Sequence, residues 1–348
     1  MQTVQNTLYV TLPQAYVHLE NDTIRIDVER EKKLQVPLHH LSAVVCIGTS
    51  ILVSPALMGR LAEEGKSLVF LDDNGRFRAR LEGPVTGNIL LRRAQHGCAD
   101  NATFTLETAR AIVAGKIKNS RQVLMRAARE TDGATAAADR STLESGADAL
   151  GESIGGLRRA TDLDQLRGVE GDAAHRYFQC FNHLIRPPMR ERFVFGGRTR
   201  RPPRDRVNAL LSFLYAVLMN DCRSALETAG LDPQLGFLHA VRPGRAALAL
   251  DLMEEFRAYS ADRLALTLIN RNQLGVKDFE EREGGAVSLT SDGRRAVIVA
   301  YQERKREETT HPLLEQKHAL AMLPFIQARL LARTIRGEVE GYVPFIAR

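Results

Sequence analysis

The sequence predicts an α+β fold, with an N-terminal β-rich domain over residues 1–84 and a larger all-α domain over residues 85–348. Short, partly alternating apolar segments separated by polar turns fill the first 81 residues, whereas apolar residues at helical spacing dominate from residue 88 onward. Gly83, Pro84 and Gly87 mark a boundary between the two patterns. With 348 residues, 44% of them hydrophobic, the chain is long and apolar enough for about two domains with real cores.

The N-terminal pattern predicts strands followed by a hairpin. Strands are expected at residues 7–11, 15–19, 23–28, 34–38, 41–47, 67–71 and 76–81. Ser54 and Pro55 suit the N-cap and first position of a helix, which Gly65 ends. The residues at 72–75, with the sequence DDNG, indicate a tight turn between the last two strands.

The C-terminal pattern predicts helices. Apolar residues between 104 and 124 are spaced like one face of a long helix, and residues 132–138 look like a loop. Further helices are expected at 143–163, 164–183, 206–229, 245–255 and 312–336. Residues 286–290 and 296–301 fit either a small hairpin or a strand followed by a helix.

The charge of the chain favours a polyanionic partner. The formal net charge is +6, and 40 of the 48 basic residues are Arg, whose guanidinium group binds phosphate through two hydrogen bonds. A GC-rich genome raises the Arg content as well, so charge alone leaves the partner open. Eight Arg lie between residues 186 and 206, where paired prolines and glycines predict a loop. Such a loop is either a phosphate clamp or a solvated surface segment.

Several protein classes lose support. Cys46, Cys98, Cys180 and Cys222 are far apart in sequence, so neither a zinc ribbon nor a redox pair is indicated. The chain has no secretory leader pattern and no run of about 18 apolar residues, so we expect a soluble, cytoplasmic protein without disulfides and without a membrane span. It also lacks a phosphate-binding glycine loop, a dinucleotide-binding fingerprint and a serine nucleophile motif.

Four polar residues near the centre of the chain can hold a divalent cation beside a phosphate. Asp251 and Glu254 are three residues apart on a predicted helix that is otherwise apolar, so both carboxylates share one semi-buried face. Burying unpaired carboxylates is costly, and a metal ion removes that cost. Glu170 and His239 add an oxygen and a nitrogen donor, and this mixed set suits Mg²⁺ or Mn²⁺.

Each of these residues also has an ordinary interpretation. The acidic pair can form a solvated helix face, and Glu170 can form an ion pair with Arg167. A single histidine such as His239 is more often part of a satisfied core than a metal ligand. Because the segments are far apart in sequence, the residues by themselves leave both interpretations open.

Four ordered motifs resemble those of the CRISPR spacer-acquisition integrases, the Cas1 family. They are LRGVEG at 166–171, RPPRDRVNALLS at 201–212, GFLH at 236–239 and DLMEEFR at 251–257. The opening NTLYV at 6–10 and the stretch from SPALMG at 54–59 to NILLRR at 88–93 resemble the type I-C branch. The likeness extends over nearly the whole chain.

This resemblance implies a fold, a site and an activity. It implies an N-terminal β-sheet domain that forms a homodimer, a linker and a helical catalytic domain. It implies that Glu170, His239 and Glu254 are the catalytic residues and the ligands of Mg²⁺ or Mn²⁺, with Asp251 as a supporting neighbour. The implied activity is that of a metal-dependent DNA endonuclease and integrase, which inserts short foreign DNA segments into a CRISPR repeat array when a DNA 3′-hydroxyl attacks a phosphodiester.

The same resemblance implies a small Cas2 partner protein that bridges two homodimers, and double-stranded DNA as substrate. Two alternatives remain: a non-catalytic DNA-binding scaffold, and a metal-dependent phosphodiesterase that acts on RNA or small nucleotides. Charge, with partial support from the family, selects six residues as candidates for the DNA surface: Arg92, Arg93, Arg200, Arg201, Arg204 and Arg257.

Overall fold

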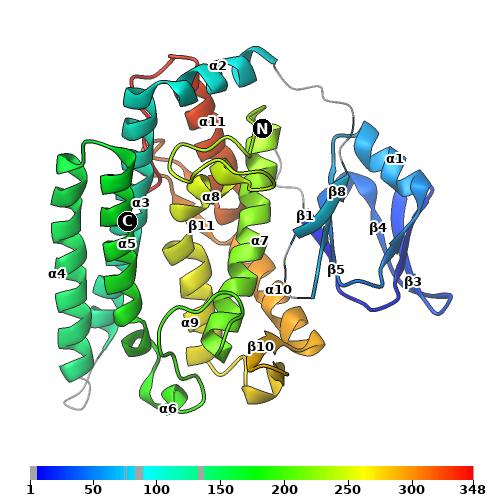
Figure 1. The fold of residues 1–348 in the computed structure, drawn as a ribbon. Helices are drawn as coiled ribbons and strands as arrows, with labels where there is room; N and C mark the ends of the chain where they lie inside the picture. Colours follow the sequence, from blue (N-terminus) through cyan, green and yellow to red (C-terminus); the bar gives the residue numbers. More distant parts are fainter. Residues whose placement is uncertain are drawn as a thin grey trace.

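The computed structural model describes residues 6–73, 75, 77–81, 83, 89–131 and 137–347. A small β-rich part lies beside a larger helical part (Figure 1). The predicted α+β fold is confirmed, although two short antiparallel strand pairs make the second part mostly helical rather than all-α. The predicted boundary at residues 84 and 85, with Gly87, falls outside the described residues.

The N-terminal part contains two four-stranded sheets. Their strand orders are β1-β5-β7-β8 and β4-β3-β2-β6. The seven predicted strands are all present at or near the expected residues, and only the short β6 was missed. The strands are β1 (Asn6–Val10), β2 (Tyr16–Glu20), β3 (Thr23–Val28), β4 (Glu31–Pro37), β5 (Leu41–Ile47), β6 (Leu52–Val53), β7 (Ser67–Leu71) and β8 (Phe77–Leu81).

Among the described residues of the N-terminal part, one α-helix packs against the core between its two sheets. Helix α1 (Pro55–Glu63) begins where expected, because Ser54 Oγ accepts a hydrogen bond from the backbone N–H of Leu57 at 3.2 Å. Leu57 and Leu61 of this helix are buried against residues of both sheets. Gly65 has a φ of +63°, a conformation that ends the helix and favours glycine.

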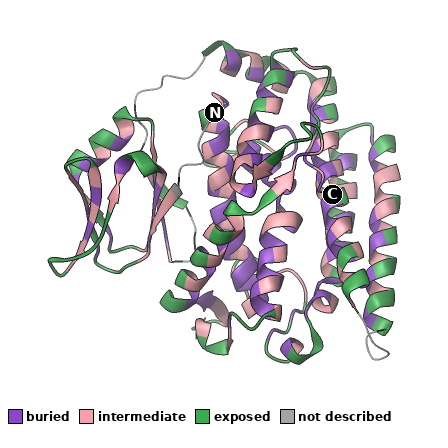
Figure 2. Cartoon of the chain, turned by 180° about the vertical axis from the view of Figure 1, so that it is seen from behind, coloured by how far each residue is buried: buried purple, intermediate pink, exposed green. Residues whose placement is uncertain are grey.

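The helical part is built around α7, which is buried along most of its length, while α4 on the outside buries only one face (Figure 2). No described helix is both long enough and apolar enough to cross a membrane. The helices are α2 (Ile89–Asp100), α3 (Ala102–Glu130), α4 (Ala137–Arg159), α5 (Leu163–Gln179), α6 (Pro187–Arg190), α7 (Arg206–Thr228), α8 (Ala247–Glu254), α9 (Arg263–Asn270), α10 (Ser291–Arg306) and α11 (Leu323–Ile335).

Several stretches differ from the sequence prediction. Helix α6 lies within residues 186–206, which were predicted to form a loop, and α9 was not predicted. Helix α4 begins at Ala137, inside the loop predicted at 132–138, and residues 132–136 of that loop fall outside the described residues. The helix expected at 312–336 begins only at Leu323, and the chain before it forms the antiparallel pair β11 (Glu308–Thr310) and β12 (Lys317–Ala319). Glu315, between these strands, has a φ of +54°, which an α-helix does not contain. Residues 296–301 lie in α10, and β10 (Ala286–Leu289) pairs instead with β9 (Phe279–Arg282), so the strand-then-helix alternative is correct there.

The two parts pack closely against each other. Val45, Ile47, Val69 and Leu71, on one face of the first sheet, belong to the same buried cluster as the helical core. An ion pair between Arg294 Nη2 and Asp73 Oδ1, 3.2 Å apart, also joins the two parts. The first sheet therefore supports the helical part, and all of the predicted site residues lie in that helical part.

Candidate active site

The structure brings the four predicted polar residues together from three segments. Glu170 lies in α5, Asp251 and Glu254 lie in α8, and His239 lies in the loop before α8. Asp251 is 0% exposed and Glu254 is 2% exposed, which excludes the solvated-face alternative. The apolar neighbours in α8 predicted this burial correctly.

Asp251 uses both carboxylate oxygens to hold the loop that carries His239. Its Oδ2 accepts the backbone N–H groups of Phe237 at 2.6 Å and Leu238 at 3.0 Å. Its Oδ1 accepts the backbone N–H of His239 at 2.9 Å and the ring Nδ1–H at 2.7 Å. A Cβ at Gly236 would lie 2.7 Å from Asp251 Oδ2, so only glycine permits this close approach. Asp251 is thus placed to orient His239.

The orientation of His239 leaves its second ring nitrogen facing Glu254. Nε2 of His239 lies 3.8 Å from Glu254 Oε1, which is too long for a direct hydrogen bond. On the other side, Arg257 Nη1 lies 3.0 Å from the same oxygen. Glu254 therefore stands between an imidazole and a guanidinium group.

Lys116 of α3 belongs to the site although the sequence did not predict it. Its Nζ forms an ion pair with Glu170 Oε1 and lies 2.8 Å from Glu254 Oε2. Glu170 therefore pairs with Lys116, and the expected ion pair with Arg167 is wrong because Arg167 pairs with Asp164 at 2.9 Å. One sequence signal could have identified Lys116: it is a lysine on the face of α3 that is otherwise formed by buried, mostly apolar residues.

The surrounding cations keep the Glu254 carboxylate ionised. Burial alone raises the pKa of a carboxyl group, but the electrostatic interactions with Arg257, Lys116 and the His239 ring outweigh burial and lower the pKa of Glu254 to about 2. Glu254 Oε2 is buried and accepts no hydrogen bond of good geometry among the described residues, although the Lys116 ammonium is close. The result is a buried negative charge held mainly by ion pairing.

The donor chemistry of these residues fits a divalent cation. As they stand, no three His, Cys, Asp or Glu side chains within the described ranges are grouped closely enough to hold a metal ion. However, the carboxylates of Glu170 and Glu254 already converge on one positive charge, that of Lys116. Oxygen donors with one imidazole nitrogen are ligands that Mg²⁺ and especially Mn²⁺ accept. The residues can therefore hold such an ion if the Lys116 ammonium withdraws.

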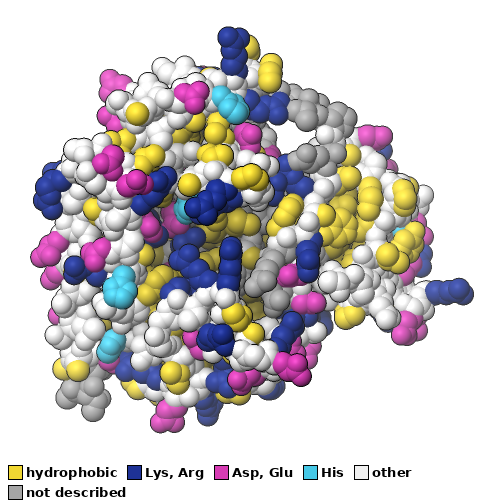
Figure 3. Space-filling model, in the orientation of Figure 1, with side chains coloured by type: hydrophobic (Ala, Val, Ile, Leu, Met, Phe, Trp, Pro, Cys, Tyr) yellow, Lys and Arg dark blue, Asp and Glu magenta, His cyan; other side chains and the backbone are white. Residues whose placement is uncertain are grey.

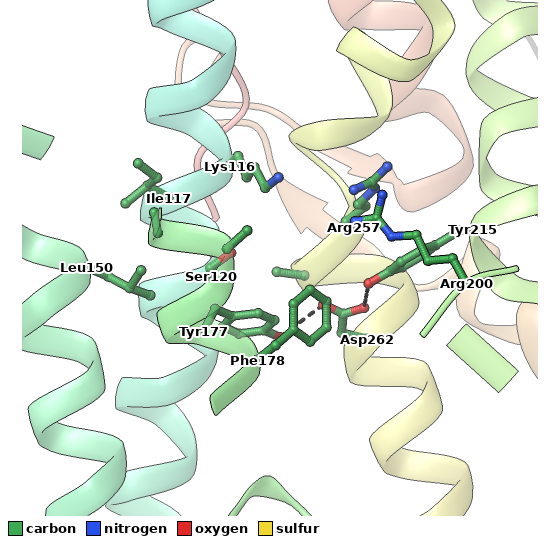
Figure 4. A pocket seen from close by; sticks show the side chains of 13 residues that line it. Lys116, Ile117, Ser120, Leu150, Tyr177, Phe178, Arg200, Tyr215, Arg257 and Asp262 are labelled. Carbon is green, nitrogen blue, oxygen red and sulfur yellow. Dashed lines mark hydrogen bonds between the residues drawn. The ribbon is translucent and has the colours of Figure 1, made fainter. Parts of the chain in front are cut away.

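A small cleft opens beside this cluster. The side chains of Arg200 and Arg257 lie next to each other on one side of it, and Lys116 lies on the opposite side (Figure 4). Positive groups beside an apolar aromatic wall suit a phosphate attached to a flat ring. The further residues lining the cleft include Tyr177, Phe178, Tyr215 and Asp262.

Asp262 forms the floor of the cleft with two tyrosines. Its Oδ1 and Oδ2 accept the hydroxyl hydrogens of Tyr215 at 2.6 Å and Tyr177 at 3.0 Å (Figure 4). Burial raises the pKa of Asp262 to about 6, although the two hydroxyl donors oppose the shift. The Arg257 guanidinium lies 4.9 Å from the centroid of the Tyr215 ring. Asp262 and Tyr215 thus support Arg257, a role that no local sequence pattern predicted.

The six predicted DNA-binding arginines lie in different settings. Arg257 is largely buried within the site, and Arg200 lines the cleft. Arg201 and Arg204 are exposed on the same loop as Arg200, and Arg204 Nη1 donates to the backbone oxygen of Gly284 at 2.6 Å. Arg92 and Arg93 lie on α2, at the top of Figure 1. Basic side chains gather around a hollow on the face of the helical part shown in Figure 3.

Residues 8–303 match the family model described as CRISPR associated protein Cas1. The chain is similar to a protein of Moorella thermoacetica named CRISPR-associated endonuclease Cas1 1, with 52% identity over 348 residues and 100% of both chains covered. These names support an enzyme of the nuclease class.

Solved structures share the fold. A casposase bound to an integration product has a TM-score of 0.82 at 20% identity, covering 97% of this chain and 92% of that one. A chain of a Cas6-RT-Cas1–Cas2 complex also has a TM-score of 0.82, at 24% identity, with 99% of this chain and 36% of that chain covered. At these identities the likeness establishes the architecture alone.

Proposed function

The chain belongs to the CRISPR associated protein Cas1 family, and from this premise we propose that it is a metal-dependent DNA integrase and endonuclease. It inserts short foreign DNA segments into the CRISPR repeat array. The observation that carries the proposal is the convergence of Glu170, Glu254 and the free Nε2 of His239 beside a basic cleft. Carboxylates and imidazole at one point, next to groups that bind phosphate, are the components of metal-assisted phosphodiester chemistry.

Glu170, His239 and Glu254 are the residues that would hold Mg²⁺ or Mn²⁺. Bound there, such an ion would lower the pKa of an attacking hydroxyl and neutralise charge on the phosphorus. Asp251 keeps Nε2 of His239 directed at Glu254, and Arg257 stabilises the ionised form of Glu254. His239 can alternatively assist proton transfer, but the contact of its Nδ1 with Asp251 favours ligation through Nε2.

The proposed reaction exchanges one phosphodiester for another. The 3′-oxygen of the incoming DNA forms a bond to a phosphorus of the repeat, the bond from that phosphorus to the 3′-oxygen of the repeat strand breaks, and the proton of the attacking hydroxyl is transferred to the released oxygen through solvent. Arg200, with Lys116 and Arg257, lines the cleft beside the cluster and is suited to hold the phosphates in line. With water as the nucleophile, the same residues would cut DNA.

We further propose a homodimer formed through the β-rich part and a small Cas2 partner. Several large apolar side chains in this part are exposed and could be covered by a second copy: Leu12, Tyr16, Leu34 and Leu52. The similar fold in a Cas6-RT-Cas1–Cas2 complex supports the choice of partner.

Two alternatives compete with this proposal. A non-catalytic DNA-binding scaffold would need the arginines but would have no use for a buried, ionised Glu254 next to His239. A metal-dependent phosphodiesterase for RNA or small nucleotides would use the same cluster but would cut without joining strands.

A strand-transfer assay separates the three functions. Purified protein is incubated with Mg²⁺ or Mn²⁺, a labelled DNA duplex with free 3′-hydroxyl ends and a supercoiled plasmid carrying a repeat, with and without Cas2. Glu170→Ala and His239→Ala are compared with Glu144→Ala and His175→Ala, which remove the same residue types from exposed positions on α4 and α5.

The integrase proposal predicts that label joins the plasmid only with metal, and only in the wild type and the two control variants. Cutting without joining, with RNA accepted as well as DNA, would favour the phosphodiesterase. DNA binding without joining or cutting, unchanged in all variants even with Cas2, would favour the scaffold.

A further inference from the structure

The last described residues of the chain are buried in the helical part close to the candidate site. Phe345 is 0% exposed, and its ring centroid lies 5.7 Å from that of Phe256, two residues beyond Glu254. Tyr342 and Ala347 are also buried. In Figure 1 the C-terminal end lies beside α3, the helix that carries Lys116. We call residues 342–347 the strap.

Glu255, the residue next to Glu254, binds the strap through hydrogen bonds to its carboxylate. Its Oε2 accepts the backbone N–H of Phe345 at 2.7 Å, and its Oε1 accepts the hydroxyl hydrogen of Tyr342. Gln327 of α11 donates to the same carboxylate at 2.9 Å. Because Glu255 is 0% exposed, these donors replace water, and loss of one leaves part of a buried carboxylate unsatisfied.

Asn119 joins the strap to α3 and to the end of α8. Its Nδ2 donates to the backbone oxygens of Glu255 at 2.7 Å and Phe345 at 2.9 Å. Its Oδ1 accepts the backbone N–H of Ala347 at 2.8 Å. Asn119 follows Lys116 by three residues in α3, about one helical turn. One buried amide therefore fixes the positions of three segments.

The packing around Gly115 shows how close the strap lies to α3. A Cβ at Gly115 would lie 2.8 Å from Pro344 Cβ and 3.4 Å from Glu255 Cγ. Only a residue without a side chain allows α3, α8 and the strap to meet at this point. This contact lies one residue before Lys116, on the same helix.

We propose that the strap positions Glu254 against Lys116 and Glu170, with Asn119 and Glu255 as positioning residues. They touch no substrate in this account. They fix the distance between the turn of α3 that bears Lys116 and the end of α8 that bears Glu254, and displacements of about 1 Å at such groups cost about 100-fold in rate. The consequence for rate rests on the proposed function, whereas the consequence for the mobility of α8 does not.

The test compares two tyrosine-to-phenylalanine variants. Tyr342→Phe removes a buried hydroxyl that donates to Glu255, and Tyr301→Phe removes a buried hydroxyl that donates to Asp221 at 2.8 Å. The single-turnover rate of strand transfer is measured at saturating Mn²⁺ and DNA, together with the Kd for DNA and the Tm. We expect Tyr342→Phe to lower the rate at least tenfold with an unchanged Kd, and Tyr301→Phe to keep the wild-type rate at a similar Tm. Asn119→Ala serves as the stronger variant.

Amide hydrogen exchange over residues 250–256 provides a readout that needs no activity. We expect faster exchange there in Tyr342→Phe than in Tyr301→Phe or the wild type. Equal exchange in all three proteins would overturn the proposed role of the strap. Equal transfer rates in Tyr342→Phe and in an active wild type would overturn it as well. A wild type without transfer activity counts against the proposed function. The exchange comparison then still tests whether the strap holds the end of α8 in place.

Discussion

Asp251 Oδ1 accepts both the ring Nδ1–H and the backbone N–H of His239, at 2.7 Å and 2.9 Å. This double contact fixes the ring and leaves Nε2 as the nitrogen that faces Glu254. A histidine held in this way is pre-oriented for a metal ion or a proton, because its tautomer and direction are both set.

Replacement of Asp251 by Asn should weaken metal binding without removing a ligand. The Asn amide would direct a donor at one of the N–H groups that the carboxylate now accepts, so the loop and the ring would shift. We expect the Kd for Mn²⁺, measured by titration calorimetry, to rise about 10-fold to 100-fold. Asp172→Asn, an exposed position on α5, is the control. An unchanged Kd in Asp251→Asn would contradict the orienting role.

Lys116 should compete with a divalent cation for Glu170 and Glu254. Its ammonium group pairs with both carboxylates, so a metal ion must displace it. In Lys116→Gln we expect Mn²⁺ to bind about tenfold more tightly, which corresponds to ~1.4 kcal/mol. Lys118→Gln, an exposed position on the same helix, should bind Mn²⁺ like the wild type. Equal or weaker binding in Lys116→Gln would mean that the ammonium and the metal do not share a site.

Asp262 should make stability depend on pH. Its pKa is about 6 in the folded protein against a usual value of 3.8, so folding favours the protonated form. The stabilising contribution is therefore complete below pH 3.8 and is lost as the pH rises through about 6, an effect of roughly 3 kcal/mol. The free energy of unfolding by denaturant, compared between wild type and Asp262→Asn from pH 4 to 7, should show a difference that changes over this range. A difference independent of pH would refute the assignment.

Gly236 should tolerate no side chain. A Cβ there would lie 2.7 Å from Asp251 Oδ2 and 2.8 Å from the backbone carbon of Ala247. We expect Gly236→Ala to lower the free energy of unfolding by about 1–3 kcal/mol. Gly171→Ala, in α5, has open space around its Cβ and should be neutral or stabilising by up to about 1 kcal/mol. Chemical denaturation of both variants checks this, and a Gly236→Ala protein as stable as the wild type would show that the loop can move away.

Exposed arginines of the 186–206 loop should contribute to the salt dependence of DNA binding. Each phosphate contact contributes about 0.9 to the slope of log K against log salt concentration, so Arg200→Ala and Arg201→Ala should each reduce its magnitude by about that amount. Arg140→Ala, on the outer helix α4, should leave the slope unchanged. Binding isotherms between 50 and 300 mM salt, roughly the range in which this effect is large, measure it. If the salt-dependence slopes of all variants equal that of the wild type, DNA does not contact Arg200 or Arg201.

The sequence predicted the strands and the strongest helices because their signals are local. Alternating apolar residues found the seven long N-terminal strands, and Ser54 and Pro55 marked the start of α1. The prediction for the segment before α11 was wrong because its leucines are spaced like those of a helix. Leu313 and Leu314 are exposed there, and the turn at Glu315 decides the local structure.

Within the site, the burial of Asp251 and Glu254 followed from their apolar helix, but their partners could not be predicted. Lys116 reaches Glu170 across 54 residues of sequence, and Asn119 reaches Phe345 across 226. Such contacts depend on how α3, α5, α8 and the strap pack together, and no local pattern encodes that packing. Donor chemistry alone made Glu170 and His239 candidates without deciding between ligand and ordinary roles, and the resemblance of their motifs to a family favoured the ligand role.

The most direct test of the account is a crystal structure of the protein grown with Mn²⁺, with the ion located by its anomalous scattering. We predict one ion between Glu170, Glu254 and Nε2 of His239, with ligand distances of about 2.0–2.3 Å, and the Lys116 ammonium moved away from the carboxylates. An ion bound elsewhere, or none at saturating Mn²⁺ with Lys116 still paired to both carboxylates, would contradict the metal site on which the proposed function depends.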